Sequence, residues 1–143
     1  MSVATILFVL AAALLAAEAV NADASGLALQ GYDPVAYFTE GAPRTGDPSI
    51  SAVHDGATYR FASTANREAF RADPEAYLPA YGGYCAWAVG QGYTAAVDPE
   101  AWTVHENRLY LNFSPGVRRR FDRSIDESIA AADANWPGLA AEL

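Results

Sequence analysis

"DPSISAVHDGATYRFASTANREAF", residues 47–70, returns in altered form 51 positions later as "DPEAWTVHENRLYLNFSPGVRRRF", residues 98–121. Eight of the 24 aligned positions are identical, whereas typical residue frequencies give roughly two by chance. A further pair, Gly31-Tyr32 and Gly83-Tyr84, aligns after a slip of one residue. The sequence therefore predicts one structural unit that is present twice.

The first copy has the pattern of a β-hairpin followed by a helix. Two strand-like runs flank Asp55-Gly56, a dipeptide that favours a tight hairpin turn. Ser63 belongs to the residue types that cap helices. The residues after it predict a helix over 64–72 that stops at Asp73-Pro74.

The second copy repeats this pattern and extends it. Its turn is predicted at Glu106-Asn107, and Ser114 is expected to cap a helix whose first residue is Pro115, where the missing N–H costs no hydrogen bond. Apolar residues then recur every four positions, which predicts one long helix, buried on one face, that reaches about Asn135. The residues of that face are Val117, Phe121, Ile125 and Ile129.

A short helical segment is predicted before each hairpin. In "GYDPVAYFTEG", residues 31–41, Asp33 is the expected cap and Pro34 the first helical residue. In "GGYCAWAVGQG", residues 82–92, glycines bound the segment. The predicted fold class is therefore α+β, with two pseudo-repeated ββα units that are each preceded by a short helical segment.

The N-terminal stretch has the composition of an export signal. Residues 3–17 carry no charge and are almost all apolar, and this length suits the hydrophobic region of a signal peptide better than a membrane span. A small-x-small site follows at Ala22-Asp23-Ala24. We expect residues 1–24 to be a signal peptide and residues 25–143 to be the exported domain, periplasmic or extracellular. An uncleaved membrane anchor is the alternative.

The composition is acidic and contains one cysteine. The 143 residues include 17 acidic and 9 basic side chains, for a net charge of −8, which argues against nucleic acid and anionic lipid as partners. Cys85 cannot form an internal disulfide because it is the only cysteine. Eight Tyr and three Trp can supply the packing that stabilises the domain instead.

Taken in order, the motifs resemble a YHS domain. The resemblance runs from "GYDPVAYF" at residue 31 to "GGYCAWAV" at residue 82, and the remainder, as far as "AADANWP", is similar to small exported YHS-domain proteins. It implies a YHS domain with a C-terminal helix over residues 25–143, and the family has no settled function.

The resemblance also bears on metal binding. Metal-associated YHS domains carry "DPVCGM" and "YFCSxxC" patterns, whose thiolates bind soft metals. In this chain Ala36, Ala62 and Asn66 stand at those cysteine positions. Since alanine has no donor atom and a neutral asparagine is a poor ligand for soft metals, we expect neither copper nor zinc, and no other cofactor.

Cys85 is the candidate catalytic residue. A helix start after Gly82-Gly83 would favour its thiolate, and the resemblance implies redox chemistry, because some family members carry selenocysteine at this position. The alternative is a small buried apolar residue. We expect the sulfur to be at least partly accessible and close to a concave surface. Two glycines are costly unless the backbone turns tightly or closely approaches another group.

Aromatic residues near the motifs form a second candidate site. They are expected either to line a pocket for a flat or apolar ligand or to pack as an ordinary aromatic core. The candidate ligand-binding residues are Tyr32, Tyr59, Tyr81, Gly82, Gly83, Tyr84 and Trp87.

The two histidines and one basic cluster are weaker candidates. His54 and His105 occupy equivalent repeat positions, and such positions usually lie far apart, so we do not expect them to share a metal ion. The cluster "VRRRFDR", residues 117–123, is basic enough to hold an anion. However, Arg118 is spaced to pair with Asp122, and Arg123 with Glu127.

Two classes of function remain open. The leading one is an exported module that binds a small ligand or a protein partner without catalysis. The alternative is a thiol-based oxidoreductase that uses Cys85, with an outside thiol or a sulfenic acid completing its cycle. Exposure of the Cys85 sulfur separates the two.

Overall fold

The computed structural model describes residues 18–143. The apolar stretch of residues 3–17, predicted to be the hydrophobic region of a signal peptide, lies outside the described residues. Within the described range, every helix is too short or too polar to cross a membrane.

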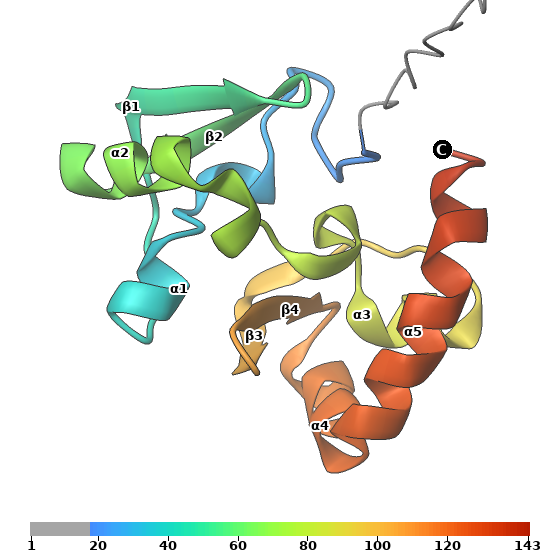
Figure 1. Cartoon of the computed structure of the whole chain (residues 1–143). Coiled ribbons are helices and arrows are strands. Elements are labelled where there is room, and N and C mark those ends of the chain that lie inside the picture. The colour runs from blue at the N-terminus through green and yellow to red at the C-terminus, as the bar shows by residue number, and fades with distance from the viewer. Residues whose placement is uncertain (1–17) are drawn as a thin grey trace, which may run out of the picture.

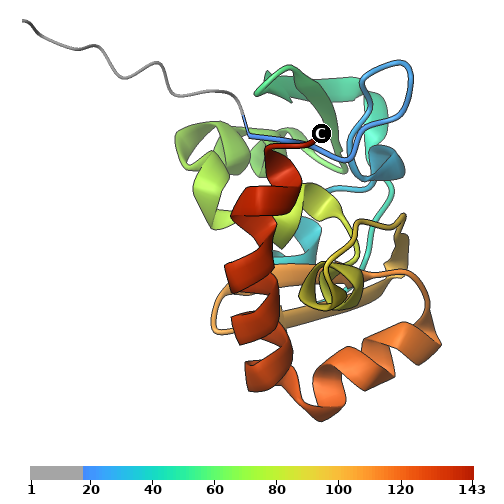
Figure 2. The same cartoon turned by 90° about the vertical axis from the view of Figure 1, so that its right-hand side faces the viewer.

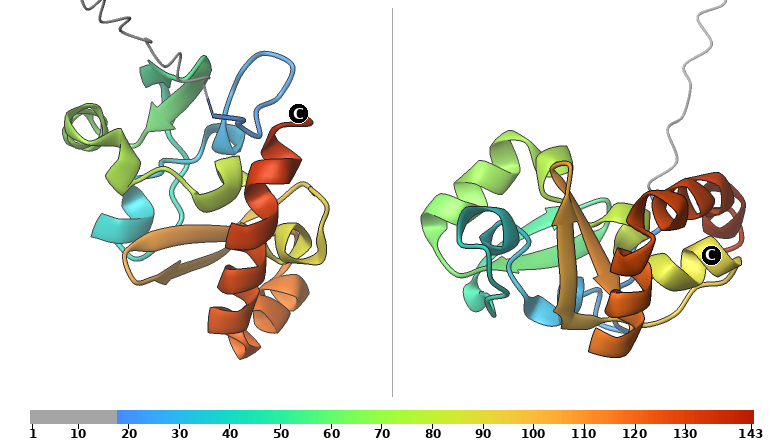
Figure 3. Two further views of the ribbon diagram at one scale, coloured as in Figure 1. Left: turned by 45° about the vertical axis from the view of Figure 1, so that its right-hand side comes forward. Right: turned by 90° about the horizontal axis from the view of Figure 1, so that it is seen from below.

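The two sequence copies form two hairpin-helix units stacked one above the other (Figure 1). The first unit contains β1 (Asp47–His54), β2 (Ala57–Phe61) and α2 (Thr64–Ala72). The second contains β3 (Asp98–His105), β4 (Arg108–Asn112) and α4 (Pro115–Arg123). Each hairpin is a separate two-stranded antiparallel sheet (Figure 3).

The two hairpins correspond residue by residue. Ala52 pairs with Tyr59 in the first hairpin, and Thr103 pairs with Tyr110 in the second. Both hairpins also have an irregular register after their first pair. Each paired residue of the second hairpin follows its counterpart by 51 positions. The predicted repeat of ββα units and the α+β class are therefore confirmed.

The helix caps also follow the prediction. The Oγ of Ser63 accepts a hydrogen bond from the N–H of Asn66 at 3.1 Å, and the Oγ of Ser114 accepts one from Val117 at 3.2 Å. Each cap satisfies one of the N–H groups that a helix start leaves without an intrahelical partner. Both hairpin turns lie at the predicted dipeptides.

The C-terminal helix is divided, so the prediction of one continuous helix was wrong. α4 ends at Arg123, Ser124 leaves helical geometry, and α5 (Ile125–Ala140) takes a new direction (Figure 2). The break allows α4 to stay against β3 and β4 while α5 packs along α3 (Ala86–Gln91). The apolar face is retained across the break, since Phe121 is fully buried and Ile129 packs against the same cluster.

A left-handed turn and a short helix precede each unit. Residues 29–31, in the 3₁₀ turn η1 (Leu29–Gly31), and residues 81–83, in η3 (Ala80–Gly83), all have φ between 51° and 83°. The short helices that follow are α1 (Ala36–Thr39) and α3. A third 3₁₀ turn, η2 (Pro74–Ala76), follows α2. The predicted short helical segments are thus present, although α1 begins two residues after Pro34.

Asp33 is fully buried and joins the parts of the first unit. Its Oδ1 accepts a hydrogen bond from the N–H of Val35 at 2.8 Å. Its Oδ2 accepts hydrogen bonds from the N–H of Ala62 at 2.8 Å and from the Nδ2 of Asn66 at 2.7 Å. One carboxylate therefore connects the start of α1 to the end of β2 and the start of α2.

Asn112 has the corresponding role in the second unit. Cys85 stands at the position of Asp33, but the acceptor comes from the end of β4 instead. The Oδ1 of Asn112 accepts hydrogen bonds from the N–H of Trp87 at 3.0 Å and from the Cys85 thiol at 3.6 Å. The Nδ2 of Asn112 is buried without a hydrogen-bond partner in residues 18–143.

The two units share one apolar core. Its larger cluster combines Phe61 and Phe70 of the first unit with Leu109 and Leu111 of the second. The hydroxyl of Tyr37 adds a hydrogen bond to the carbonyl of Pro99 at 2.8 Å across the boundary between the units. Because an isolated two-stranded hairpin is at best marginally stable in water, we expect the units to fold and unfold together.

Removing the Asp33 carboxylate tests its role as the connection within the first unit. We expect Asp33→Ala to lower the free energy of unfolding by about 3 kcal/mol or more, because several buried donors lose their acceptor. Urea denaturation followed by tryptophan fluorescence measures this change. Asp73→Ala is the matched control, since Asp73 is exposed and its side chain caps no helix, and we expect a change within about 0.5 kcal/mol. Equal losses of unfolding free energy in Asp33→Ala and Asp73→Ala would contradict the role of Asp33 as the connection within the first unit.

Candidate functional site

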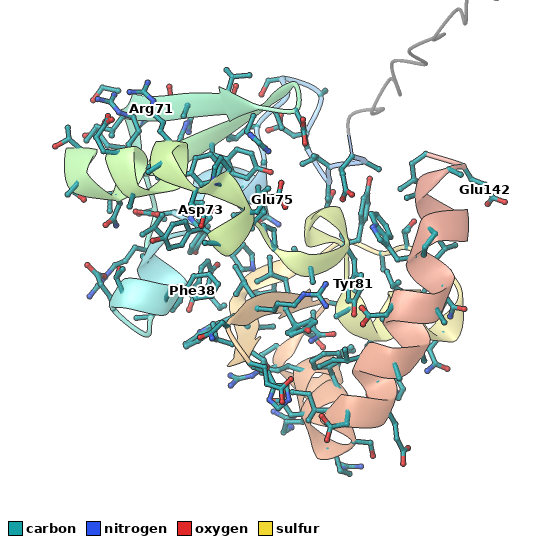
Figure 4. All side chains as sticks on the ribbon, in the orientation of Figure 1. Phe38, Arg71, Asp73, Glu75, Tyr81 and Glu142 are labelled. Atoms are coloured by element: carbon teal, nitrogen blue, oxygen red, sulfur yellow. The ribbon has the colours of Figure 1, made fainter. Side chains whose placement is uncertain are left out.

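A cavity of about 270 Å³ lies where the two hairpin turns meet the segment between α2 and α3. We call it the junction pocket. Glu75 and Tyr81, both labelled in Figure 4, come from that segment. The residues that define the junction pocket are His54, Asp55, Tyr59, Glu75, Tyr81 and Arg108.

Tyr59 brings an unpartnered hydroxyl to the wall of the junction pocket. Its side chain is 1% exposed and packs against Phe70 with ring centroids 5.2 Å apart. The hydroxyl makes no hydrogen bond to any residue from 18 to 143. Burial, helped by the charges of Asp55 and Glu75, raises the pKa of this hydroxyl well above its usual value. Tyr59 therefore stays protonated at neutral pH and offers both a donor and an acceptor.

His54 lies between two carboxylates at the edge of the junction pocket. Its Nε2 is 3.4 Å from the Oδ2 of Asp55 and 3.9 Å from an oxygen of Glu75. The second unit has a related arrangement, in which the Nε2 of His105 is 3.4 Å from the Oδ1 of Asp126. Each histidine thus has its own acidic neighbours. Within residues 18–143 no group of three or more His, Cys, Asp or Glu side chains is arranged to hold a metal ion.

Arg108 enters the junction pocket from the second hairpin, and its positive charge is already balanced by a neighbouring carboxylate. Its guanidinium carbon lies 5.6 Å from the ring centroid of Tyr81 and 5.3 Å from that of Tyr110, distances that suit cation–π contacts. Its charge faces Asp133, whose Oδ1 is 3.3 Å from Nη1. The hydroxyl of Tyr81 donates to the same carboxylate oxygen at 2.9 Å. Arg108 is therefore anchored and is not a free cation.

Residues 18–20 line one side of the junction pocket, and Asn21 fixes this segment in place. The backbone N–H of Asn21 donates to the carbonyl of Gly82 at 2.8 Å, and its Nδ2 donates to the carbonyl of Gly83 at 3.3 Å. A Cβ atom on Gly82 would lie 2.1 Å from the carbonyl oxygen of Ala19. This segment can lie here only because residue 82 has no side chain.

Gln30 shows that the backbone geometry alone does not require glycine at residue 82. It holds the equivalent position in the first unit with φ 51°, against 60° for Gly82. Its Nε2 donates to the carbonyl of Val97 at 2.9 Å. A glutamine thus tolerates the same left-handed conformation. The close approach expected from the glycine pair is made by the N-terminal segment of the chain itself.

The Cys85 sulfur is not accessible, so the expectation of an exposed thiol was wrong. Cys85 is 1% exposed and belongs to the core cluster that the two units share. Cys85 is the N-cap of α3, one residue before the first turn in which we expected it. The thiol is inside because its position is equivalent to that of Asp33, which faces the interior of the first unit. The glycines before it serve residues 18–22 and open no cleft at the sulfur.

Three of the seven candidate ligand-binding residues, Tyr59, Tyr81 and Gly82, meet in the junction pocket. Sequence reasoning missed Asp55, Glu75, Asn107, Arg108 and Trp136, which line it as well. The one signal that pointed to part of this set is that Asp55 and Asn107 are the predicted turn residues of the two copies.

The other four candidates lie in separate places. The hydroxyl of Tyr32 donates to Glu100 at 3.4 Å, and Gly83 lines a small hollow beside the N-terminal segment. The ring of Tyr84 lies 6.1 Å from that of Trp136. Trp87 lines a groove beside α4 and α5. The structure therefore does not gather the seven residues into one site.

The positions where the YHS resemblance implied cysteine ligands meet around Asp33. The N–H groups of Ala36 and Ala62 and the side-chain amide of Asn66 all direct hydrogen bonds to its carboxylate. These three positions thus donate hydrogen bonds to one buried carboxylate.

The basic cluster on α4 is partly paired. Arg118 lies 3.3 Å from Asp122, as the spacing predicted. Arg123 and Glu127 are on different helices, because α4 ends before Ser124, and they form no ion pair in the described part of the chain. Arg123 instead lines an open groove that it shares with Trp87.

Comparison of the chain with protein-family models, with curated proteins and with solved structures gave no match. The junction pocket is the candidate site because, within the described residues, its wall brings Tyr59 together with the buried Nε2 of His54, which has no hydrogen-bond partner.

Adding one methyl group at Gly82 tests the docking of residues 18–22. We expect Gly82→Ala to lower the free energy of unfolding by about 2–4 kcal/mol, since a left-handed alanine costs ~1 kcal/mol and the backbone clash with Ala19 adds the rest. Gly41→Ala is the matched control, because Gly41 has φ 64° and nothing within 4 Å of its added Cβ. Faster hydrogen exchange at the Asn21 amide should accompany the loss. Identical stability of the two variants would argue against the contact.

Alkylation of Cys85 tests whether the thiol is sealed in the core. We expect iodoacetamide to label the native protein at least ~100-fold more slowly than the urea-unfolded chain, because labelling requires opening of the core. The control is Val53→Cys in a Cys85→Ser background, since residue 53 is 72% exposed and should react at nearly the unfolded rate. Rapid labelling of Cys85 in the native protein would contradict its burial and would support a reactive thiol.

Proposed function

We propose that the chain is a non-catalytic binding module of the YHS type and that its binding site is the junction pocket. The observation that supports this best is that the cavity wall combines Tyr59, a residue 1% exposed, with the buried Nε2 of His54, which has no hydrogen-bond partner in residues 18–143. Small-molecule sites are usually concave, with aromatic walls and a few converging polar groups. The junction pocket has this form, and a bound ligand would complete the hydrogen bonding of Tyr59.

The chemistry of the wall favours binding over catalysis. The described residues that line the junction pocket include no serine, threonine, cysteine or lysine, so covalent catalysis there would depend on a carboxylate, the histidine or a tyrosine. His54 has the chemistry to move a proton, but it is directed at Asp55 and Glu75. The alternative of a thiol-based oxidoreductase is weakened because Cys85 is buried away from this wall.

Export to the periplasm or the extracellular space is part of the proposal and rests on the apolar stretch of residues 3–17. Cleavage after Ala24 would remove Glu18, Ala19 and Val20 from the pocket wall. It would also break the hydrogen bonds of Asn21 to Gly82 and Gly83. The processed domain would then have a wider pocket mouth than the full chain.

Native mass spectrometry of the protein purified from its host tests the binding and the export together. We expect a retained small molecule and an N-terminus near residue 25. Ala76→Trp should abolish retention, because Ala76 is an exposed residue of the pocket wall and the larger side chain would fill the cavity. Ala72→Trp, at the exposed end of α2, is the matched control and should retain the molecule. A protein without ligand, or retention that survives Ala76→Trp, would contradict the proposed site, and an N-terminus at Met1 would contradict cleavage.

A further inference from the structure

The charges around the junction pocket do not balance. Asp55 and Glu75 contribute two carboxylates that remain in its wall after cleavage, whereas His54, which lies between them, and Arg108 are the basic side chains there. The charge of Arg108 is already met by Asp133, 3.3 Å away and outside the wall. The cavity therefore presents an excess of negative charge to any molecule that enters it, and charge complementarity favours a cation.

The neutral groups of the wall suit the same kind of ligand. Tyr59 lines the same cavity as Asp55 and Glu75, and its hydroxyl can accept a hydrogen bond from a ligand. Trp136 adds an aromatic surface, and an indole face attracts cations more strongly than other rings. A carboxylate pair, a hydroxyl oxygen and an aromatic wall together match an ammonium group carried on an apolar body.

We infer that the junction pocket binds a small primary amine in its ammonium form, with the charged nitrogen at Asp55, Glu75 and the Tyr59 hydroxyl. This inference rests on the proposed function and names its ligand class. The three N–H groups of a primary ammonium meet three acceptors, which a quaternary ammonium cannot do. The apolar part of the ligand lies toward Leu78 and Trp136.

Other ligand classes fit the wall less well. A metal ion lacks a suitable group of ligands in residues 18–143. An anion would have to approach the carboxylates of Asp55 and Glu75 and compete with Asp133 for Arg108.

The second unit supplies internal controls for these acids. Glu106 occupies the position of Asp55 in the other hairpin turn and has the same φ of 48°. Asp126 lies near His105 as Glu75 lies near His54. Neither Glu106 nor Asp126 lines the junction pocket. Neutral substitutions of Glu106 and Asp126 remove one negative charge each, as do those of Asp55 and Glu75, but they leave the wall of the junction pocket unchanged.

Four matched probes test the ligand class with the full chain. They are 2-phenylethylamine, its N,N,N-trimethyl analogue, 2-phenylethanol and phenylacetate, which share an aromatic body and differ at the head group. Binding is measured by saturation-transfer NMR and isothermal titration calorimetry at pH 7. We expect the primary amine to bind most tightly, and its affinity to fall as sodium chloride is added.

Isosteric variants then locate the charge. Asp55→Asn and Glu75→Gln should each weaken amine binding by about threefold to tenfold, and Tyr59→Phe by about threefold. Glu106→Gln and Asp126→Asn should leave it unchanged. Thermal unfolding by circular dichroism confirms that each variant folds, and the loss for Tyr59→Phe should be confined to the primary amine.

The outcomes separate this inference from the proposed function. Equal or tighter binding of the alcohol, the carboxylate or the trimethyl analogue would overturn the primary-amine assignment. Equal losses in Glu106→Gln and Glu75→Gln would overturn the location. A retained native ligand that is not an amine would overturn the ligand class and leave the junction pocket as the site. If no native ligand is retained and no probe binds, both proposals fail.

Discussion

Each half of this fold depends on one fully buried side-chain acceptor at the start of its short helix. In the first half the acceptor is the carboxylate of Asp33, and in the second it is the amide oxygen of Asn112. Because an N–H group buried without a partner costs free energy comparable to a lost hydrogen bond, these two acceptors fix how each short helix meets its hairpin. The two acceptors bind equivalent helix starts but come from different elements. Asp33 comes from the turn before its helix, and Asn112 comes from the end of a strand.

The position of the junction pocket follows from that arrangement. Once each short helix is tied to its hairpin, the core residues of both units meet, and Tyr37 bonds across to Pro99. The two hairpin turns then reach the segment between α2 and α3, and the cavity remains among them. The polar groups there are consequently supplied by elements whose stability comes from elsewhere, which is the usual way in which a rigid scaffold presents a binding site.

The parts of the fold that could be predicted are those with local causes. Ser63 and Ser114 each indicate a helix that begins at the next residue, and Asp55-Gly56 indicates a turn. The repeated units can therefore be predicted from the sequence alone. The break at Ser124 could not be predicted, because the apolar spacing continues unchanged across it. The burial of Cys85 could not be predicted either, because it results from packing in a core cluster whose residues are remote in sequence. The junction pocket was missed for the same reason, since Glu75, Arg108 and Trp136 meet only through tertiary packing.

The correspondence between the two hairpin turns also has a consequence for symmetry. A dimer of identical units would bring two copies of one turn to a shared twofold axis, so both sides of its central cavity would carry the same groups. Two units joined in one chain are free of that restriction. Here His54 and Asp55 enter from one turn, and Asn107 and Arg108 enter from the other. The two copies thereby give the cavity two unlike ends, so a bound molecule would meet different side chains at its head and at its tail.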